Sequence, residues 1–386
     1  MTSDLGTING DPRIARRIEL DFQAPSVTGD GLEGFHRDAA GNVVVQGTMA
    51  ARAYMMVPPC ATAQHKAGVL IYGHGFFGSL DELRDSEFIR DLSANGCWIV
   101  AGTLWTGMSQ EDIPNALLAL NDLNQAWGFG ERIFQGILNT IALEQLVRGK
   151  LAAELLVDGS SASIVDSSRV VFLGISLGHI LGSTFLAYDP FVSRGVLHVG
   201  AANWALMFER SKNWAIYGLP LKGSYGTLLD AVIMEQALQF ALDIVDGATV
   251  APLSIPGTPA KQMLMVTSIA DAQVPNLASF YQARSLGLTL LTPSVVVPFG
   301  FDAMKAAAAD RAYVIVDEHP TPLPPETNEV FAFDNPAHEN PRRREAVQQM
   351  MQEFWANGVV HNTCAGACDC AAGKCGELSV PMFGGH

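Results

Sequence analysis

Charged residues are scarce in this sequence, and basic residues are the scarcer kind. They make up 16% of the 386 positions, with 24 Lys and Arg against 39 Asp and Glu, so the formal net charge is −15. Binding to the phosphates of nucleic acid needs clustered Lys and Arg. The longest basic run is Arg342-Arg343-Arg344, which looks like the solvated face at the start of a helix. No nucleic acid partner is therefore expected.

Long hydrophobic runs are missing as well. No stretch reaches the about 18 apolar residues of a membrane-spanning helix, so no membrane span is expected. The polar start Met1-Thr2-Ser3-Asp4 lacks the apolar core of a signal peptide. There is no internal repeat and no low-complexity tract. Hydrophobic residues still make up 48% of the chain, which is enough for a large core.

Paired C-x2-C spacing, common in zinc sites, is absent, and we expect no metal. Six cysteines are present, and crowding of four of them near one end predicts two disulfides and an exported protein. We therefore expect a secreted or periplasmic protein whose signal peptide is not part of the given chain. Cys60 and Cys97 flank neighbouring strands of the expected sheet and could form a bridge or remain buried thiols. The four crowded cysteines are Cys364, Cys368, Cys370 and Cys375.

Short, continuously apolar runs predict the strands of one buried sheet. Strands covered by helices on both faces have this pattern, whereas a strand with one solvated face alternates. Helical patterns separate the runs, and such alternation predicts an α/β fold with a mostly parallel, doubly wound sheet. The strands are expected at 69–72, 98–101, 170–173, 196–199, 263–266 and 313–316, and the helices at 82–94, 113–127, 132–146, 177–187, 276–286 and 342–356.

Two segments depart from this alternation. Residues 1–66 carry strand-like runs at 17–22 and 43–57, which predict antiparallel edge strands joined to the main sheet. Residues 203–259 show no strand but apolar residues at helical spacing. This second segment could simply pack on a small core of its own; we favour a helical cap over a cleft. The division is then a main domain at 67–202 and 260–360, the cap, and a Cys-rich tail at 361–386, with Trp204, Phe208 and Trp214 of the cap meeting an apolar substrate.

A serine stands between a predicted strand and a predicted helix, in Gly174-Ile175-Ser176-Leu177-Gly178. A turn this tight strains the backbone at the serine and pushes its hydroxyl outward, and side chains in place of the flanking glycines would collide with the turn. The pattern predicts that Ser176 is a nucleophile. His179 follows on the helix, where its ring should point away and pack.

A serine needs a base, and the base needs a third group to orient it. The acid expected is Asp271, which follows the predicted strand 263–266 at the carboxyl edge of the sheet; it could instead cap a helix or turn. We expect His338 to be the base because its loop, just before the last helix, can reach over that edge. His319, directly after the last strand, is the alternative. His361 adjoins the cysteines, and His386 is terminal.

Two backbone N–H groups should hold the oxyanion that forms on attack. One is expected from Leu177, at the positive end of the helix after the serine. The other should come from the Gly-rich loop after strand 69–72, where Phe76 is the expected donor. His74 and Gly75 of that loop are expected to support it by hydrogen bonds and close backbone packing rather than to act in catalysis.

Over about residues 65–360, the sequence resembles the α/β-hydrolase superfamily in the order and spacing of four motifs. These are the His-Gly loop at 74–78, the serine motif at 174–178, Asp271 with Val274-Pro275, and His338. The chain looks most like the secreted bacterial esterases and lipases of that superfamily. The resemblance implies a Ser-His-Asp mechanism through an acyl-enzyme, without a cofactor. His179 is a departure, because similar enzymes often have Gly there. The first 60 residues and the tail match nothing general in the superfamily.

These observations predict a carboxylic ester hydrolase acting on apolar acyl, aromatic or polymeric esters. A serine peptidase or amidase on the same fold is the nearer alternative. A binding protein that keeps the fold without catalysis is the more distant one. Acyl and alcohol preference, cysteine pairing and oligomeric state do not follow from the sequence.

Overall fold

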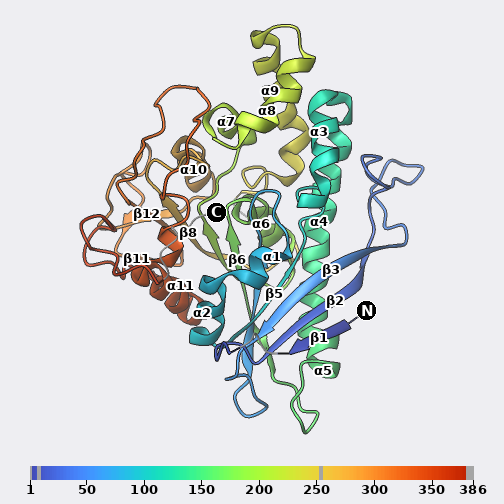
Figure 1. Ribbon diagram of the computed structural model, residues 1–386, viewed down its shortest axis with the longest axis vertical. Coiled ribbons are helices and arrows are strands. Elements are labelled where there is room, and N and C mark those ends of the chain that lie inside the picture. Colours follow the sequence, from blue (N-terminus) through green and yellow to red (C-terminus); the bar gives the residue numbers. More distant parts are fainter. Residues whose placement is uncertain (1, 7–9, 252–254, 380–386) are drawn as a thin grey trace.

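The computed structural model describes residues 2–6, 10–251 and 255–379. One sheet runs through the centre of the protein, with helices on both of its faces (Figure 1). Its strand order is β1-β2-β3-β5-β4-β6-β7-β8-β12-β9-β10. The first three strands pair antiparallel and the others parallel, which gives the mostly parallel sheet that the sequence predicts.

The strands expected from the six apolar runs are confirmed, because each run lies in or overlaps a strand of the parallel part. Their side chains alternate between two cores: Val69 and Ile71 pack on one face, and Leu70 and Tyr72 on the other. The parallel strands are β4 (Ala67–Gly73), β5 (Trp98–Thr103), β6 (Val165–Ile175), β7 (Arg194–His198), β8 (Gln262–Ser268), β9 (Thr289–Leu291), β10 (Lys305–Ala306) and β12 (Arg311–Val316).

The antiparallel edge was expected from the alternating N-terminal runs, but the second run was placed too early. That strand begins at Thr48, because residues 43–47 take part in a loop with an isolated bridge between Arg37 and Val43. The edge strands are β1 (Thr2–Gly6), β2 (Arg16–Pro25) and β3 (Thr48–Val57); a separate two-stranded sheet pairs β11 (Ala308–Ala309) with β13 (Val360–His361).

Helices α4, α6 and α10 cover one face of the sheet, and α2 and α11 cover the other (Figure 1). The expected helices at 82–94, 113–127, 132–146 and 342–356 have other boundaries in the structure. The helices are α1 (Leu80–Asp85), α2 (Glu87–Gly96), α3 (Ile113–Asn121), α4 (Ala126–Leu146), α5 (Ala152–Glu154), α6 (Leu177–Tyr188), α7 (Trp204–Met207), α8 (Trp214–Ser224), α9 (Leu228–Leu242), α10 (Asn276–Ser285) and α11 (Glu345–Asn357).

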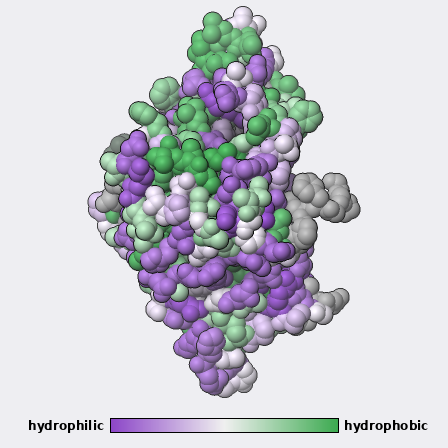
Figure 2. Space-filling model, turned by 90° about the vertical axis from the view of Figure 1, so that its left-hand side faces the viewer, coloured by the Kyte–Doolittle hydropathy of each residue, from purple (hydrophilic) through white to green (hydrophobic). Residues whose placement is uncertain are grey.

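Helices α8 and α9 project from one end of the molecule, beside α3 (Figure 1). Apolar side chains gather at this end, at the top of Figure 2. The exposed apolar residues of the two helices are Ile216, Leu219, Leu228, Leu229, Ile233 and Phe240.

All six cysteines form disulfides. Cys60 pairs with Cys97, which settles the choice between a bridge and two thiols, and the tail contains Cys364–Cys368 and Cys370–Cys375. The two disulfides expected in the tail are thus confirmed. The tail is attached to the main sheet by backbone hydrogen bonds, because Asp317 at the end of β12 donates to Cys368 and accepts from Cys370.

Candidate active site

Ser176 stands at the sharp turn between β6 and α6. Its backbone has φ 57° and ψ −117°, a conformation that L-residues rarely adopt. The turn is closed by glycines: a Cβ on Gly174 would lie 2.0 Å from the carbonyl oxygen of Gly178, and a Cβ on Gly178 would lie 2.0 Å from that of Gly73. The strained serine is therefore held by close backbone contacts that only glycine permits.

Asp271 and His338 meet at the carboxyl edge of the sheet. The Nδ1 atom of His338 lies 2.7 Å from Oδ2 of Asp271, and both residues are buried. The other carboxylate oxygen accepts the backbone N–H groups of Gln273 and Val274 at 2.8 and 3.1 Å. Because an ionised carboxylate only accepts, the hydrogen bond places a proton on Nδ1 and leaves Nε2 as an acceptor.

The charge of Asp271 also sets the protonation of His338. Burial alone would lower the pKa of His338, but the Asp271 carboxylate outweighs burial through its charge and hydrogen bond and raises the pKa above its ordinary value. Asn335 joins the two loops, because its side-chain amide donates to the carbonyl oxygen of Ala270 at 2.8 Å.

Ser176 and His338 line one polar cleft. Within the described part of the chain no hydrogen bond joins the two side chains. A serine–histidine bond of this kind is often long or misaligned before substrate binds. The cleft is lined by Ser176 just after β6, by Gln273 of the loop after β8 and by His338 of the loop before α11.

The loop after β4 approaches Ser176 from the other side. His74 holds it from beneath: its Nε2 accepts the N–H of Trp105 at 2.9 Å, and its Nδ1 lies 2.8 Å from the carbonyl oxygen of Gly75. Burial lowers the pKa of His74, so the ring is neutral. The N–H of Gly75 donates to Glu82 at 2.8 Å. No backbone hydrogen bond from the N–H of Phe76 or of Leu177 is found in the described chain.

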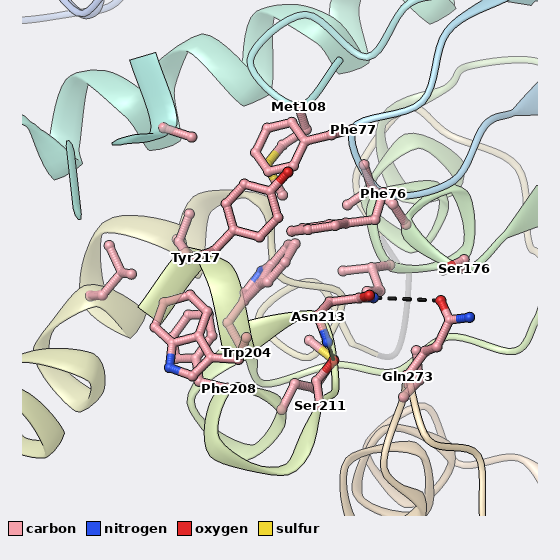
Figure 3. A pocket seen from close by; sticks show the side chains of 18 of the residues that line it. Phe76, Phe77, Met108, Ser176, Trp204, Phe208, Ser211, Asn213, Tyr217 and Gln273 are labelled. Atoms are coloured by element: carbon pink, nitrogen blue, oxygen red, sulfur yellow. Dashed lines mark hydrogen bonds between the residues drawn. The ribbon is translucent and has the colours of Figure 1, made fainter. Parts of the chain in front are cut away.

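Aromatic rings tie this loop to helix α8. The ring of Tyr217 stacks on Phe77 at 4.9 Å and meets Phe76 edge to face at 5.1 Å, as Figure 3 shows. Phe77 has a positive φ of 45°. The sequence pattern of segment 203–259 had suggested apolar aromatics but could not indicate that Tyr217 contacts the loop of Phe76.

The three aromatic residues expected to meet substrate line a narrow apolar slot that ends at Ser176 (Figure 3). Phe208 and Trp214 stack at 4.3 Å, and Trp204 lies beside them. The indole N–H of Trp214 donates to the side chain of the buried Glu235 at 2.8 Å. The opposite wall comes from α3 and α6, through Ala116, Leu120 and Ile180.

The basic run before α11 is not a solvated helix face, and this expectation was wrong. Arg342 is buried and bonded to Glu339, and Arg343 donates to the same carboxylate at 2.9 Å. Burial would raise the pKa of Glu339, but the charges of Arg342, His338 and Arg343 lower this pKa to about 2. The helix begins only at Glu345, so Arg342 and Arg343 line the cleft beside His338, and Arg344 bonds to Glu318.

His319 and His179 have side-chain partners other than Ser176. His319 is 3.3 Å from Asp317 and 3.4 Å from Asp369, at the cysteine-rich tail. His179 is buried, with Nε2 2.7 Å from Gln282 and Nδ1 accepting the N–H of Gly200 at 2.8 Å. Burial lowers the pKa of His179 to about 3, so it packs as a neutral ring. His361 pairs in β13, and His386 lies outside the described residues.

Among residues 2–6, 10–251 and 255–379, none of the helices combines the length and the apolar character that a membrane span requires. No three His, Cys, Asp or Glu side chains there form a group that could hold a metal ion.

Comparison with known proteins shows similarity in structure alone. No family model and no curated protein matches the sequence. An acylaminoacyl peptidase from Pyrococcus horikoshii aligns with a TM-score of 0.47 and 14% identity over 89% of this chain, which spans 41% of that chain. An acetyl xylan esterase from Paenibacillus sp. R4 aligns with a TM-score of 0.47 and 13% identity, over 74% of this chain and 78% of that one. Acetyl xylan esterase 1 from Thermoanaerobacterium aligns with a TM-score of 0.45 and 15% identity, over 69% and 78%.

Proposed function

We propose that this protein hydrolyses carboxylic esters, with Ser176 as the nucleophile, His338 as the base and Asp271 as the group that orients it. The observation that carries the proposal is the 2.7 Å hydrogen bond between His338 and Asp271, formed at the cleft that Ser176 also lines. A buried histidine held through one ring nitrogen by a carboxylate, in the same cleft as a strained serine, is the arrangement that nucleophilic catalysis by serine uses.

The reaction proceeds in two halves. Nε2 of His338 takes the proton of Ser176 as Oγ attacks the ester carbonyl, and the N–H groups of Phe76 and Leu177 stabilise the oxyanion. Collapse of the tetrahedral intermediate breaks the bond to the alcohol, which leaves with the proton from His338. Water, deprotonated by the same imidazole, then attacks the acyl-enzyme, and the acid is freed as His338 returns the proton to Oγ of Ser176. No cofactor takes part.

The test is hydrolysis of p-nitrophenyl acetate by the native protein and by Ser176→Ala. The variant should keep its circular dichroism spectrum and melting temperature and lose at least about a thousandfold in kcat/KM. Ser294→Ala, at a serine on a surface loop, is the matched control and should retain full turnover. Equal turnover by Ser176→Ala and the native protein would refute the proposal. Matched ester and anilide substrates distinguish an esterase from an amidase.

We further propose that segment 203–259 acts as the cap of this site and that residues 67–202 and 260–360 form the catalytic domain. The apolar slot under α8 and α9 supports this division. The three disulfides support a secreted or periplasmic location, because disulfides persist in oxidising compartments.

A further inference from the structure

Two cavities of different character meet at Ser176. The slot is narrow, about 80 Å³, and its walls are almost wholly apolar. The cleft is wider, about 460 Å³, and mostly polar. Ser176, Phe76, Asn213 and Gln273 line both. The Asn213 and Gln273 side chains approach to 3.5 Å beside the serine, where the two cavities adjoin (Figure 3).

The position of His338 determines which part of an ester enters which cavity. The leaving alcohol must face the imidazole, because His338 returns the proton to its oxygen. Among the described residues, His338 lines the cleft and not the slot. An ester carbonyl held between Ser176 and Phe76 therefore directs its alcohol into the cleft and its acyl chain into the slot.

The chemistry of the slot suits an unbranched apolar chain. Its lining combines aromatic rings from α7 and α8 with aliphatic side chains from α3 and α6, and its few polar groups include Ser211 and Asn213. Burial of methylene groups in such a slot is favourable, whereas burial of a hydroxyl there would leave it without a partner.

The chemistry of the cleft suits hydroxyl groups. Arg343 donates to Glu339 through Nη1, and within the described chain its Nη2 has no partner. Asp85, an exposed carboxylate, and Ser86 line the same cleft. Because guanidinium donors and carboxylate acceptors stand together, a neutral group that both donates and accepts fits better than an ion of either sign.

We infer that the substrate is an ester of an unbranched apolar acid with a polyhydroxylated alcohol, bound with its acyl chain in the slot of Trp204, Phe208 and Trp214 and its alcohol in the cleft of Arg343 and Asp85. This inference rests on the proposed ester hydrolysis and gives it a substrate class and a direction.

Two isomeric esters test the direction on the native protein. In 1-hexanoylglycerol the six-carbon chain is the acid and glycerol is the alcohol. In hexyl glycerate the six-carbon chain is the alcohol and the hydroxylated three-carbon unit is the acid, so the two esters have the same formula. We expect kcat/KM for 1-hexanoylglycerol to exceed that for hexyl glycerate by at least about tenfold. The inference would be overturned by equal kcat/KM values for the two isomers or by the reverse order. It would also be overturned if neither isomer is hydrolysed by a protein that turns over p-nitrophenyl acetate, and the esterase proposal would then remain intact. Absence of turnover on p-nitrophenyl acetate as well would refute both.

A substitution in the slot tests where the chain binds. Ala116 is buried in the wall of the slot on α3, and Ala116→Phe would fill it. The ratio of kcat/KM for 1-hexanoylglycerol over 1-acetylglycerol should fall about tenfold. Leu118→Phe, on the same helix but 57% exposed, should leave the ratio unchanged. An unchanged ratio in folded Ala116→Phe would contradict binding of the acyl chain in the slot. If the phenylalanine ring prevents folding, Ala116→Leu is measured instead of Ala116→Phe.

Discussion

Asp271 and His338 are 67 positions apart in the chain, and their side chains form a buried hydrogen bond of 2.7 Å. The bond depends on two loops that the sheet positions: one follows β8, and the other precedes α11. Asn335 joins them through Ala270.

The hydrogen bond between Asp271 and His338 leads to a prediction about the pH dependence of activity. His338 must be neutral to accept a proton, and its pKa is raised, so activity should be lost as pH falls through a value above the ordinary 6.5 of a histidine.

Asp271→Asn tests this cause. The substitution removes the carboxylate that raises the pKa of His338 and leaves the burial that lowers it. The acid limb of kcat/KM against pH should therefore move to lower pH, while the maximum falls by about three to four orders of magnitude because the imidazole loses its preferred tautomer. An acid limb that stays in place in the variant would show that Asp271 does not control this histidine.

Tyr217 is predicted to position the loop that carries Phe76. Its ring contacts both Phe76 and Phe77, so its loss should let the loop move. Tyr217→Leu should lower kcat by about tenfold to a hundredfold with a smaller change in KM. Tyr217→Phe keeps the ring and should retain kcat. Binding of a trifluoromethyl ketone, whose adduct carries an oxyanion, should weaken in the leucine variant by the same factor; a loss in the phenylalanine variant as well would assign the effect to the hydroxyl.

Glu235 makes stability depend on pH. Burial first, and the hydrogen bond with Glu209 second, raise the pKa of Glu235 to about 8, so the folded protein keeps a proton that the unfolded chain releases near its ordinary 4.5. Stability should consequently fall as pH rises from about 4.5 to about 8 and then level off. Glu235→Gln keeps an acceptor for Trp214 and cannot ionise. Its melting temperature should fall less than that of the native protein between pH 5 and 9, and parallel falls would contradict the assignment.

The Cys60–Cys97 disulfide closes the longest of the three loops, since its cysteines are 37 positions apart. Replacement of both by serine should lower the free energy of unfolding by about 2–4 kcal/mol. Urea denaturation under non-reducing conditions measures the change. A loss of the same size in the double variant of Cys364 and Cys368, whose loop is only four residues, would show that loop length does not govern the effect.

The central strands could be predicted because each is buried on both faces and so is continuously apolar. The helix boundaries could be predicted less accurately, because a single polar residue is enough to end a helix. Ser86 interrupts the expected helix 82–94 and caps α2 through the N–H of Ile89. Asp122 ends α3 and bonds to the N–H of Asn124, so the next helix starts at Ala126 and not at residue 132. Each residue has the chemistry of an N-cap, but helical periodicity on both sides conceals it.

Ser176 and Asp271 could be selected from the sequence because each follows an apolar run, and the ends of parallel strands meet at one edge. His338 could be selected because it stands in the loop before the last predicted helix. The side chains that surround these three residues could not be predicted. Burial of Arg342 depends on Glu339 and on the sheet edge beneath them, and a run of three arginines carries no sign of either. Contact between Tyr217 and Phe76 joins residues 141 positions apart, which no local pattern reports.

The most direct measurement is covalent labelling by a fluorophosphonate, which reacts with a serine only when a neighbouring base activates it. We predict that the intact mass of the folded native protein rises by one adduct, that peptide mapping places the adduct on Ser176, and that labelling is lost in Ser176→Ala and slowed severely in His338→Ala. A native protein that stays unlabelled, or that carries the adduct on another serine, would contradict the account.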